Sequence, residues 1–151
     1  MRLSDSAKHW IAAIAWAGLI SILSTEAFSS ENTSRILVPL LRWVFPHATA
    51  ATILLMQTFI RKLAHVTEYL IFSILLLRVV RRKERGWTLR WAIWAVVIAA
   101  GYASLDEFHQ VFVPGRHASP WDASLDTLGA AAAQVALWLR YLRRGNEFGG
   151  S

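Results

Sequence analysis

The sequence contains no cysteine, and charged residues make up only 17% of its 151 positions, against about 25% in typical soluble domains. Without cysteine, disulfide scaffolds, thiolate metal sites and cysteine nucleophiles are excluded. Hydrophobic residues account for 55% of the chain, which excludes an intrinsically disordered protein. The length permits one domain, and the composition favours a small membrane protein over a soluble one.

The basic residues do not lie along one recognisable nucleic-acid-binding element. The formal net charge is +6, but lysine and arginine stand between apolar runs rather than along one element that reads nucleic acid. We therefore expect no nucleic-acid partner. In a membrane protein these residues instead report which end of each helix faces the cytoplasm.

Four apolar stretches predict membrane-spanning helices, each of which requires about 17–25 mostly apolar residues. They cover about residues 10–23, 63–80, 87–105 and 123–142, and residues 27 and 28 extend the first. Tryptophan and tyrosine side chains near their ends suit the membrane–water interface. The prediction is an all-α membrane protein, in which a single domain over residues 1–151, with its core at about 10–142, forms a four-transmembrane-helix bundle.

Basic residues set the predicted orientation of these spans. Six lysines and arginines lie at positions 78–90, between the second and third spans, against the single Glu84. Three arginines follow the fourth span, whereas residues 106–122 carry three acids against Arg116 alone. Both termini and the middle loop are therefore expected in the cytoplasm, and residues 25–62 and 106–122 on the outer side.

The long outer segment contains two apolar runs. Residues 36–46 carry Pro39 and Pro46, which we expect to break any single helix. The second run, residues 50–60, leads directly into the second span. We predict an interfacial helix between the first two spans, followed by a helix that begins near Ala48 and continues into the second span. A re-entrant segment is the alternative.

Polar residues within or beside the spans are expected to lie in one leaflet. An ionisable side chain at the centre of a membrane costs about 2.5–3.5 kcal/mol, so a group of them is a functional signal. The residues are His65 and Glu68 in the second span, Asp106, Glu107 and His109 at the end of the third, Arg116 in the following loop, and Asp122 and Asp126 at the start of the fourth. Structural charges placed at random would not all fall at the same end of the helices.

Helical spacing places Arg61, His65 and Glu68 on one face of the second span, at i, i+4 and i+7. A structural interpretation is also open for the last two. In it, Glu68 pairs with a nearby lysine or arginine and ties two helices together. His65 is then a hydrogen-bonded core histidine.

The third span ends on a polar cluster. If its helix continues beyond the apolar residues, Glu107 is turned away from the face shared by Asp106, His109 and Gln110. A Pro-Gly pair after the cluster predicts a tight turn. We expect this turn to aim Arg116 back at the acids.

The fourth span carries a stripe of Asp122, Asp126, Gly129 and Ala133. The small residues at Gly129 and Ala133 have the spacing that lets membrane helices approach closely. Asp122 also has a structural interpretation, because aspartate before an apolar run commonly caps the start of a helix.

Three ordered motifs together point to a known family. They are RKLAHVTEY at residues 61–69, DEFHQVFVPGR at residues 106–116, and Asp122 followed by Leu128-Gly129. They resemble the VanZ-like family of small bacterial membrane proteins, over about residues 10–142. The resemblance implies a multi-pass protein of the bacterial cytoplasmic (inner) membrane.

Carried over by position, the residues marked in that family fall on eleven positions of this chain. They are Lys62, His65, Glu68, Tyr69, Asp106, Glu107, Gln110, Pro114, Gly115, Arg116 and Asp122. Asp126 departs from the asparagine usual in the family, and Ala133 replaces a frequent glycine. The extra carboxylate makes the predicted cluster more negative, so its preference for lipid or metal is expected to differ from that of relatives.

The namesake of the family is linked to low-level resistance to the glycopeptide antibiotic teicoplanin, and the resemblance supplies no reaction. Our first interpretation is a non-enzymatic envelope protein that binds a membrane lipid headgroup or a lipid-linked cell-wall precursor and modulates glycopeptide susceptibility. The expected ligand-binding residues are Lys62, His65, Glu68, Tyr69, Asp106, Glu107, Gln110, Arg116, Asp122 and Asp126. Arginine and lysine suit phosphate, and carboxylates accept hydrogen bonds from amine or sugar groups.

Two alternatives are an enzyme and a translocator. A metal-dependent membrane hydrolase or transferase acting on a lipid-linked substrate would use a divalent metal ion. Its candidate ligands are His65, Glu68, Asp106, His109 and Asp122. Its candidate catalytic residues are His65, Glu68, Asp106 and Glu107. A small lipid or ion translocator would need an oligomer, because four short helices make a poor conduit.

Overall fold

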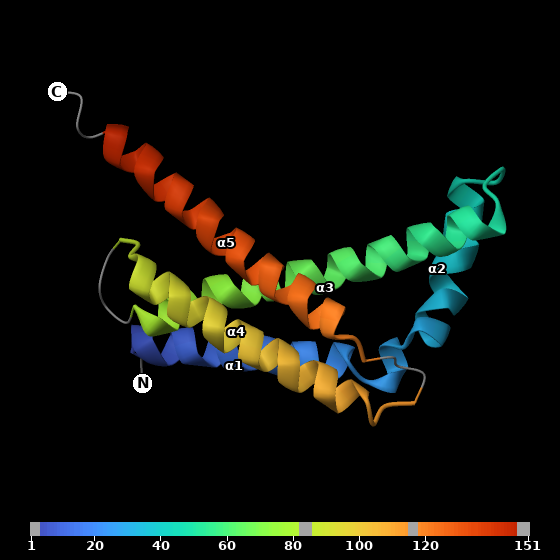
Figure 1. Cartoon of the computed structure of the whole chain (residues 1–151), viewed down its shortest axis with the longest axis horizontal. Helices are drawn as coiled ribbons and strands as arrows, with labels where there is room; N and C mark the ends of the chain where they lie inside the picture. Colours follow the sequence, from blue (N-terminus) through green and yellow to red (C-terminus); the bar gives the residue numbers. More distant parts are fainter. Residues whose placement is uncertain (1–3, 82–85, 115–117, 148–151) are drawn as a thin grey trace.

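The structure, a computed structural model, describes residues 4–81, 86–114 and 118–147. All regular secondary structure in these ranges is helical (Figure 1), which confirms the all-α prediction. The elements are α1 (Asp5–Leu23), the short 3₁₀ helix η1 (Glu26–Phe28), α2 (Ser30–Val44), α3 (Ala50–Val80), α4 (Leu89–Gln110) and α5 (Pro120–Glu147).

Local sequence explains where these helices begin. The side chains of Ser4, Ser29 and Thr49 cap α1, α2 and α3 by accepting a hydrogen bond from a backbone N–H in the first turn. α5 begins at Pro120, whose fixed φ angle and missing N–H suit the first position of a helix. Asp122 therefore lies inside the first turn, and its interpretation as the helix cap is wrong.

Within the described residues, three helices are long and apolar enough to cross a membrane: α1, α3 and α4. α5 has 28 residues but carries Asp122, Asp126 and Gln134 within its apolar stretch. Three of the four expected spans thus have the length and composition of a membrane helix. The fourth span stays a prediction.

α3 is the central helix. α1, α4 and α5 all pack against it, and α5 crosses it near its middle (Figure 1). The core contains Tyr69, Phe72 and Leu76 of α3, which pack against Ile20 of α1 and against alanines of α4 and α5. Alanine on the neighbouring helices leaves room for the large side chains of α3, so the helices pack closely at this level.

At Gly129, α5 lies very close to α3. A Cβ atom placed on Gly129 would lie 2.6 Å from the backbone oxygen of Val66, which only glycine avoids. Ala133, one turn further along α5, is also buried. The close approach expected from the small-residue spacing is therefore confirmed.

Large apolar side chains also cover the outside of the helices. Ile14 of α1, Leu55 of α3, Ile93 of α4 and Leu128 of α5 are all more than half exposed. Helices that are apolar on their outer as well as their inner faces suit a hydrocarbon surrounding.

The segment before α3 confirms one prediction and corrects another. α3 begins at Ala50 and runs unbroken to Val80, close to the expected start near Ala48. α2 also runs unbroken through Pro39 and ends before Pro46, so the expectation that both prolines break the helix is wrong for the first of them. An internal proline removes one backbone hydrogen bond. Packing of α2 against α3 offsets that loss, since Gln57 of α3 donates hydrogen bonds to the first turns of α2.

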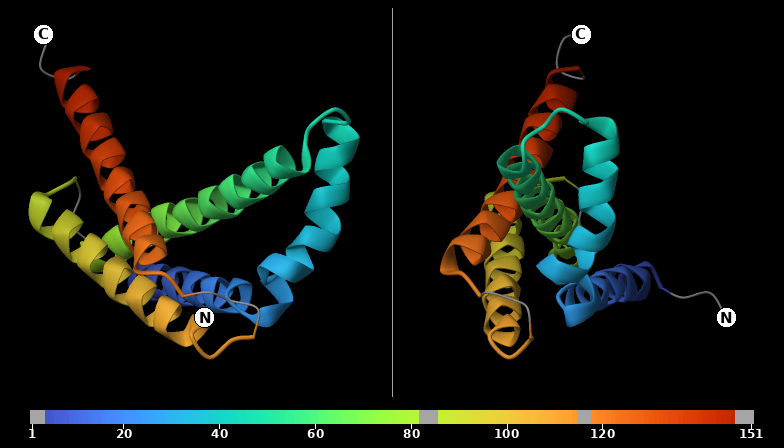
Figure 2. Two further views of the ribbon diagram at one scale, coloured as in Figure 1. Left: turned by 45° about the vertical axis from the view of Figure 1, so that its right-hand side comes forward. Right: turned by 90° about the vertical axis from the view of Figure 1, so that its right-hand side faces the viewer.

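The start of α1, the end of α3, the start of α4 and the far end of α5 lie on the same side of the molecule (Figures 1 and 2). The opposite side holds the end of α4, the start of α5 and α2. This arrangement agrees with the distribution of lysine and arginine, which predicts both termini and the middle loop on one side of the membrane. The compartment on each side stays a prediction.

Candidate functional site

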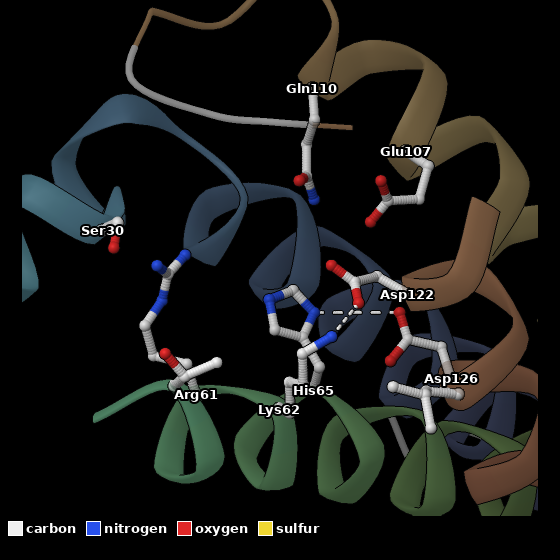
Figure 3. A pocket seen from close by; sticks show the side chains of 10 residues that line it. Ser30, Arg61, Lys62, His65, Glu107, Gln110, Asp122 and Asp126 are labelled. Carbon is white, nitrogen blue, oxygen red and sulfur yellow. Dashed lines mark hydrogen bonds and ion pairs between the residues drawn. The ribbon is translucent and has the colours of Figure 1, made fainter. Parts of the chain in front are cut away.

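A cavity of about 200 Å³ lies where α3, the end of α4, the start of α5 and the start of α2 meet (Figure 3). It holds six of the residues expected to bind a ligand. The lining residues are Ser30, Thr58, Arg61, Lys62, His65, Glu107, Gln110, Asp122, Leu125 and Asp126. We call it the outer cavity, from the side on which the sequence predicts it.

The α3 wall of the outer cavity carries three basic side chains. The guanidinium of Arg61 extends into the space between Ser30 and His65 (Figure 3), and no ion pair to it occurs among the described residues. Lys62 Nζ lies 2.5 Å from Asp122 Oδ1 and joins α3 to α5. Arg61 is therefore the cation that remains available to an anionic group.

The α5 wall carries a buried carboxylate, Asp126. Asp126 is only 1% exposed, and its Oδ2 lies 3.8 Å from His65 Nδ1. That distance allows charge attraction but is too long for a hydrogen bond. The other oxygen, Oδ1, has no hydrogen-bond partner in the described part of the chain. A donor from a bound molecule would satisfy it.

The α4 wall corrects a prediction. Glu107, expected to turn away, is buried, lines the cavity and accepts a hydrogen bond of 2.7 Å from the backbone N–H of Ser119. His109, expected to face inward, is exposed. A helix turns by about 100° per residue, so Gln110 and His109 lie on opposite sides of Asp106. The bundle covers the side of Gln110, which is also the side of Glu107.

Asp106 does not line the outer cavity but contacts Gln110, which does. Its carboxylate accepts hydrogen bonds from Ser24 Oγ at 2.6 Å and from Gln110 Nε2 at 3.1 Å, all three side chains being buried. It thus ties the end of α1 to the end of α4 and orients the Gln110 amide, which lines the cavity.

Glu68 and Tyr69 lie outside the lining of the outer cavity. Tyr69 is fully buried in the core, where its ring packs edge-on against Phe72 with centroids 6.3 Å apart. The backbone oxygen of Glu68 accepts a hydrogen bond from Trp16 Nε1 at 3.0 Å. The structure thus gives the Tyr69 ring and the Glu68 backbone contacts that hold the bundle together.

Two expected residues, Gly115 and Arg116, lie outside the described residues, and the expected role of Arg116 stays a prediction. Pro114, just before them, is exposed. The sequence interpretation missed Ser30 and Thr58 as lining residues. Thr58 lies one helical turn before Arg61, so helical spacing could have predicted it as a lining residue. Ser30 belongs to another helix, and no sequence pattern relates it to the cavity.

The expected metal ligands do not come together in the described part of the chain. There, no group of three or more histidine, aspartate or glutamate side chains is placed to hold a metal ion. His65 and Asp122 line the cavity, Asp106 and Glu68 lie outside its lining, and His109 is on the exposed face of α4.

The fold and cavity together define a class: an all-helical protein with three helices suited to a bilayer and a polar cavity of mixed charge. The model of a family described as VanZ/LLP1 matches residues 9–141. The chain belongs to this family, and is a VanZ-like membrane protein. No match was found among the curated proteins or the solved structures.

Proposed function

We propose that this protein binds the polar headgroup of a membrane lipid, or of a lipid-linked cell-wall precursor, in the outer cavity. Through this binding it modulates susceptibility to glycopeptide antibiotics such as teicoplanin. The observation that carries the proposal is a cavity lined by charged side chains of both signs from three helices, beside an apolar core.

The proposal includes a fourth membrane span. α5, at 28 residues, is about 42 Å long, more than the roughly 30 Å of hydrocarbon that a span must cross. Its polar residues Asp126 and Gln134 are buried against the bundle, so they do not face lipid. α2 then lies at the membrane surface, and both termini are in the cytoplasm of a bacterial cell.

The charges of the outer cavity suit a headgroup that has both an anionic and a hydrogen-bond-donating part. Arg61 offers a planar pair of donors, which matches phosphate oxygens. Asp126 and Glu107 offer acceptors for amine or hydroxyl groups. A headgroup that carries a phosphate next to an amine or a sugar uses both sets at once.

An apolar groove beside the cavity suits the chain of such a lipid. The groove, of about 800 Å³, runs between α4 and α5 past Phe108, Val111 and Leu128. Glu107 lines both the groove and the outer cavity. A headgroup in the cavity therefore has an adjoining apolar path for its hydrocarbon chain, which favours a lipid over a water-soluble ligand.

Lipid titration of the purified protein, followed by native mass spectrometry, tests the proposal. The probes are phosphatidylethanolamine, phosphatidylglycerol and an undecaprenyl-pyrophosphate-linked precursor. Arg61→Gln and Glu107→Gln should weaken retention of the preferred lipid at least about tenfold, since each removes a charged hydrogen-bonding group. The matched controls Arg42→Gln and Glu31→Gln change exposed residues of α2 outside the cavity. Equal retention by cavity and control variants would overturn the proposal.

Teicoplanin susceptibility tests the cellular part separately. Expression of the parent in a susceptible bacterium should raise the inhibitory concentration, and Arg61→Gln should remove that rise at equal protein level. If lipid retention falls but susceptibility is unchanged, binding stands and the resistance role is wrong.

A further inference from the structure

A second cavity, of about 290 Å³, lies at the opposite end of α3, between its last turn, the start of α4 and the second half of α5. We call it the inner cavity. Arg78, Arg81 and Arg140 line it together with Trp87 and Tyr141, and no acidic side chain is among its described lining residues. It shares no residue with the outer cavity.

The three arginines of the inner cavity have no counterion in the part of the chain that the structure describes. None of Arg78, Arg81 and Arg140 forms an ion pair there. Arg78 and Arg140 are exposed and Arg81 is partly buried. Like charges around one space repel one another, and an anion between them would lower that repulsion.

Two buried N–H donors at this cavity lack an acceptor among the described residues. Arg81 Nε and Trp87 Nε1 are both shielded from solvent, and no hydrogen-bond partner for either occurs in residues 4–81, 86–114 and 118–147. A buried donor without a partner costs about 1–3 kcal/mol, so two beside one cavity indicate a missing acceptor. Since both groups can only donate, a group that satisfies them has to offer acceptor atoms, as phosphate oxygens do.

The backbone at Gly86 helps to form this cavity. Gly86 has φ +100°, a left-handed conformation that glycine adopts without strain. Trp87, the next residue, lines the cavity, and its ring lies 6.2 Å from that of Trp138 of α5. The ring contact with α5 fixes the place of the Trp87 donor beside the cavity.

Position along α3 places the inner cavity at the other membrane surface. Arg61 and Arg81 are about 20 residues apart on one continuous helix, a rise of about 30 Å, which equals the thickness of the hydrocarbon core. An apolar groove of about 480 Å³ between α4 and α5 adjoins the cavity through Trp87, which lines both. An anion with a hydrocarbon chain fits this pair of spaces.

We infer that the inner cavity binds the phosphate group of an anionic phospholipid from the leaflet next to it. The arginines hold the phosphate oxygens, Trp87 donates to one of them, and the acyl chain follows the groove between α4 and α5. Basic pockets between helices on the cytoplasmic side are suited to anionic headgroups. This inference does not rest on headgroup binding in the outer cavity.

Native mass spectrometry of the full chain, with phosphatidylglycerol and phosphatidylcholine in equal amounts, tests it. The parent should retain phosphatidylglycerol preferentially, and Arg81→Gln/Arg140→Gln should reduce that retention at least about tenfold. The matched control Arg90→Gln/Arg143→Gln removes two exposed arginines from the same end of the molecule but outside the cavity. It should retain the lipid within about twofold of the parent.

Two results would overturn the inference. One is a parent without preference for the anionic lipid, and the other is an equal loss in both double variants, which would mean diffuse surface charge. Circular dichroism confirms that each variant is folded. If the cavity double variant does not fold, Arg140→Gln alone, an exposed side chain, should still show a loss that Arg143→Gln does not.

Competition by inorganic phosphate distinguishes a site for free phosphate from a site for the phosphate group of a phospholipid. Displacement of phosphatidylglycerol by millimolar phosphate would show that the phosphate group alone is recognised. Retention of the lipid under the same conditions would show that the acyl chain in the groove is also required. Either result supports phosphate binding, provided that the Arg81→Gln/Arg140→Gln variant loses it.

Discussion

The two cavities at opposite ends of α3 hold their charges in different ways. In the outer cavity, Lys62 pairs with Asp122, and His65 faces Asp126. In the inner cavity, Arg78, Arg81 and Arg140 meet no acid among the described residues. A cavity that balances its own charges keeps its shape without a ligand and can select polar groups of either sign, whereas a cavity of one sign depends on an anion from outside.

The apolar surroundings of the cavities differ less than their charges. Each adjoins a groove between α4 and α5, through Glu107 at the outer end and Trp87 at the inner end. The residue shared with the groove is an acceptor at one end and a donor at the other. This difference predicts that the two cavities select different lipid headgroups, even if the hydrocarbon chains in the two grooves are of the same kind.

Gly129→Ala should have the largest effect, because it breaks the helix crossing that lies between both cavities. The added Cβ would meet the backbone oxygen of Val66 at 2.6 Å, and backbone cannot move aside as a side chain can. We expect the free energy of unfolding to fall by about 2–4 kcal/mol, measured by thermal unfolding in detergent with circular dichroism. Both cavities should lose lipid retention.

Gly101→Ala is the matched control, since a Cβ at Gly101 of α4 meets nothing within 4 Å. It should leave stability unchanged or raise it by up to about 1 kcal/mol, because alanine favours the helix. Similar unfolding of the two variants would show that the approach of α5 to α3 is not as close as the structure places it.

Asp106→Ala should separate the two ends by damaging the outer cavity alone. The change leaves Ser24 Oγ and Gln110 Nε2 buried without their acceptor, at a cost of about 2–3 kcal/mol. Chemical unfolding and lipid retention give the two readouts. Inner-cavity retention of phosphatidylglycerol should persist under conditions where the variant is folded.

A double-mutant cycle identifies the hydrogen bond as the cause. Ser24→Ala and Asp106→Ala together should cost less than the sum of the two single changes, by about 1 kcal/mol. Ser104→Ala, an exposed residue of α4 whose hydroxyl bonds only to its own helix, is the control and should change stability little. Additive effects of Ser24 and Asp106 would contradict the arrangement.

Asp126→Asn, which introduces the residue expected from the family resemblance, should have the smallest effect on stability. It removes one negative charge from the outer cavity and leaves the charge of the inner cavity unchanged. Replacing a buried carboxylate with a neutral amide of the same shape lowers the cost of burial. We expect the free energy of unfolding to rise by about 1 kcal/mol and retention of anionic lipid in the outer cavity to increase several-fold. Inner-cavity retention should not change, and a change at both ends would contradict separate sites.

Much of the fold could be predicted from the sequence, because apolar periodicity and chain length act locally. The start of α3 near residue 50 and its continuation into the second span followed from an unbroken apolar pattern. The passage of α2 through Pro39 did not. The local cost of a proline argued against it, and only the packing of α2 on Gln57 of α3 offsets that cost.

The sequence predicted at which end of the helices the candidate site lies, but not which face of each helix lines it. Helical spacing predicted Arg61, His65 and Glu68 on one face of α3. Arg61 and His65 line the outer cavity, whereas Glu68 does not. The same reasoning put His109 inward and Glu107 outward, the reverse of the structure. Spacing gives the angle between two side chains on a helix, but it does not say which side the neighbouring helices cover.

By itself, the sequence determined the helices, the membrane character and the end at which the outer polar residues gather, since composition and hydropathy act along the chain. Only the tertiary structure decided which of those residues line a cavity. It placed Asp106 and Tyr69 behind the wall and Ser30 in it. It also brought Arg81, Trp87 and Arg140 together at the other end. The physical reason is that such groups form through contacts between helices distant in sequence, which no local pattern records.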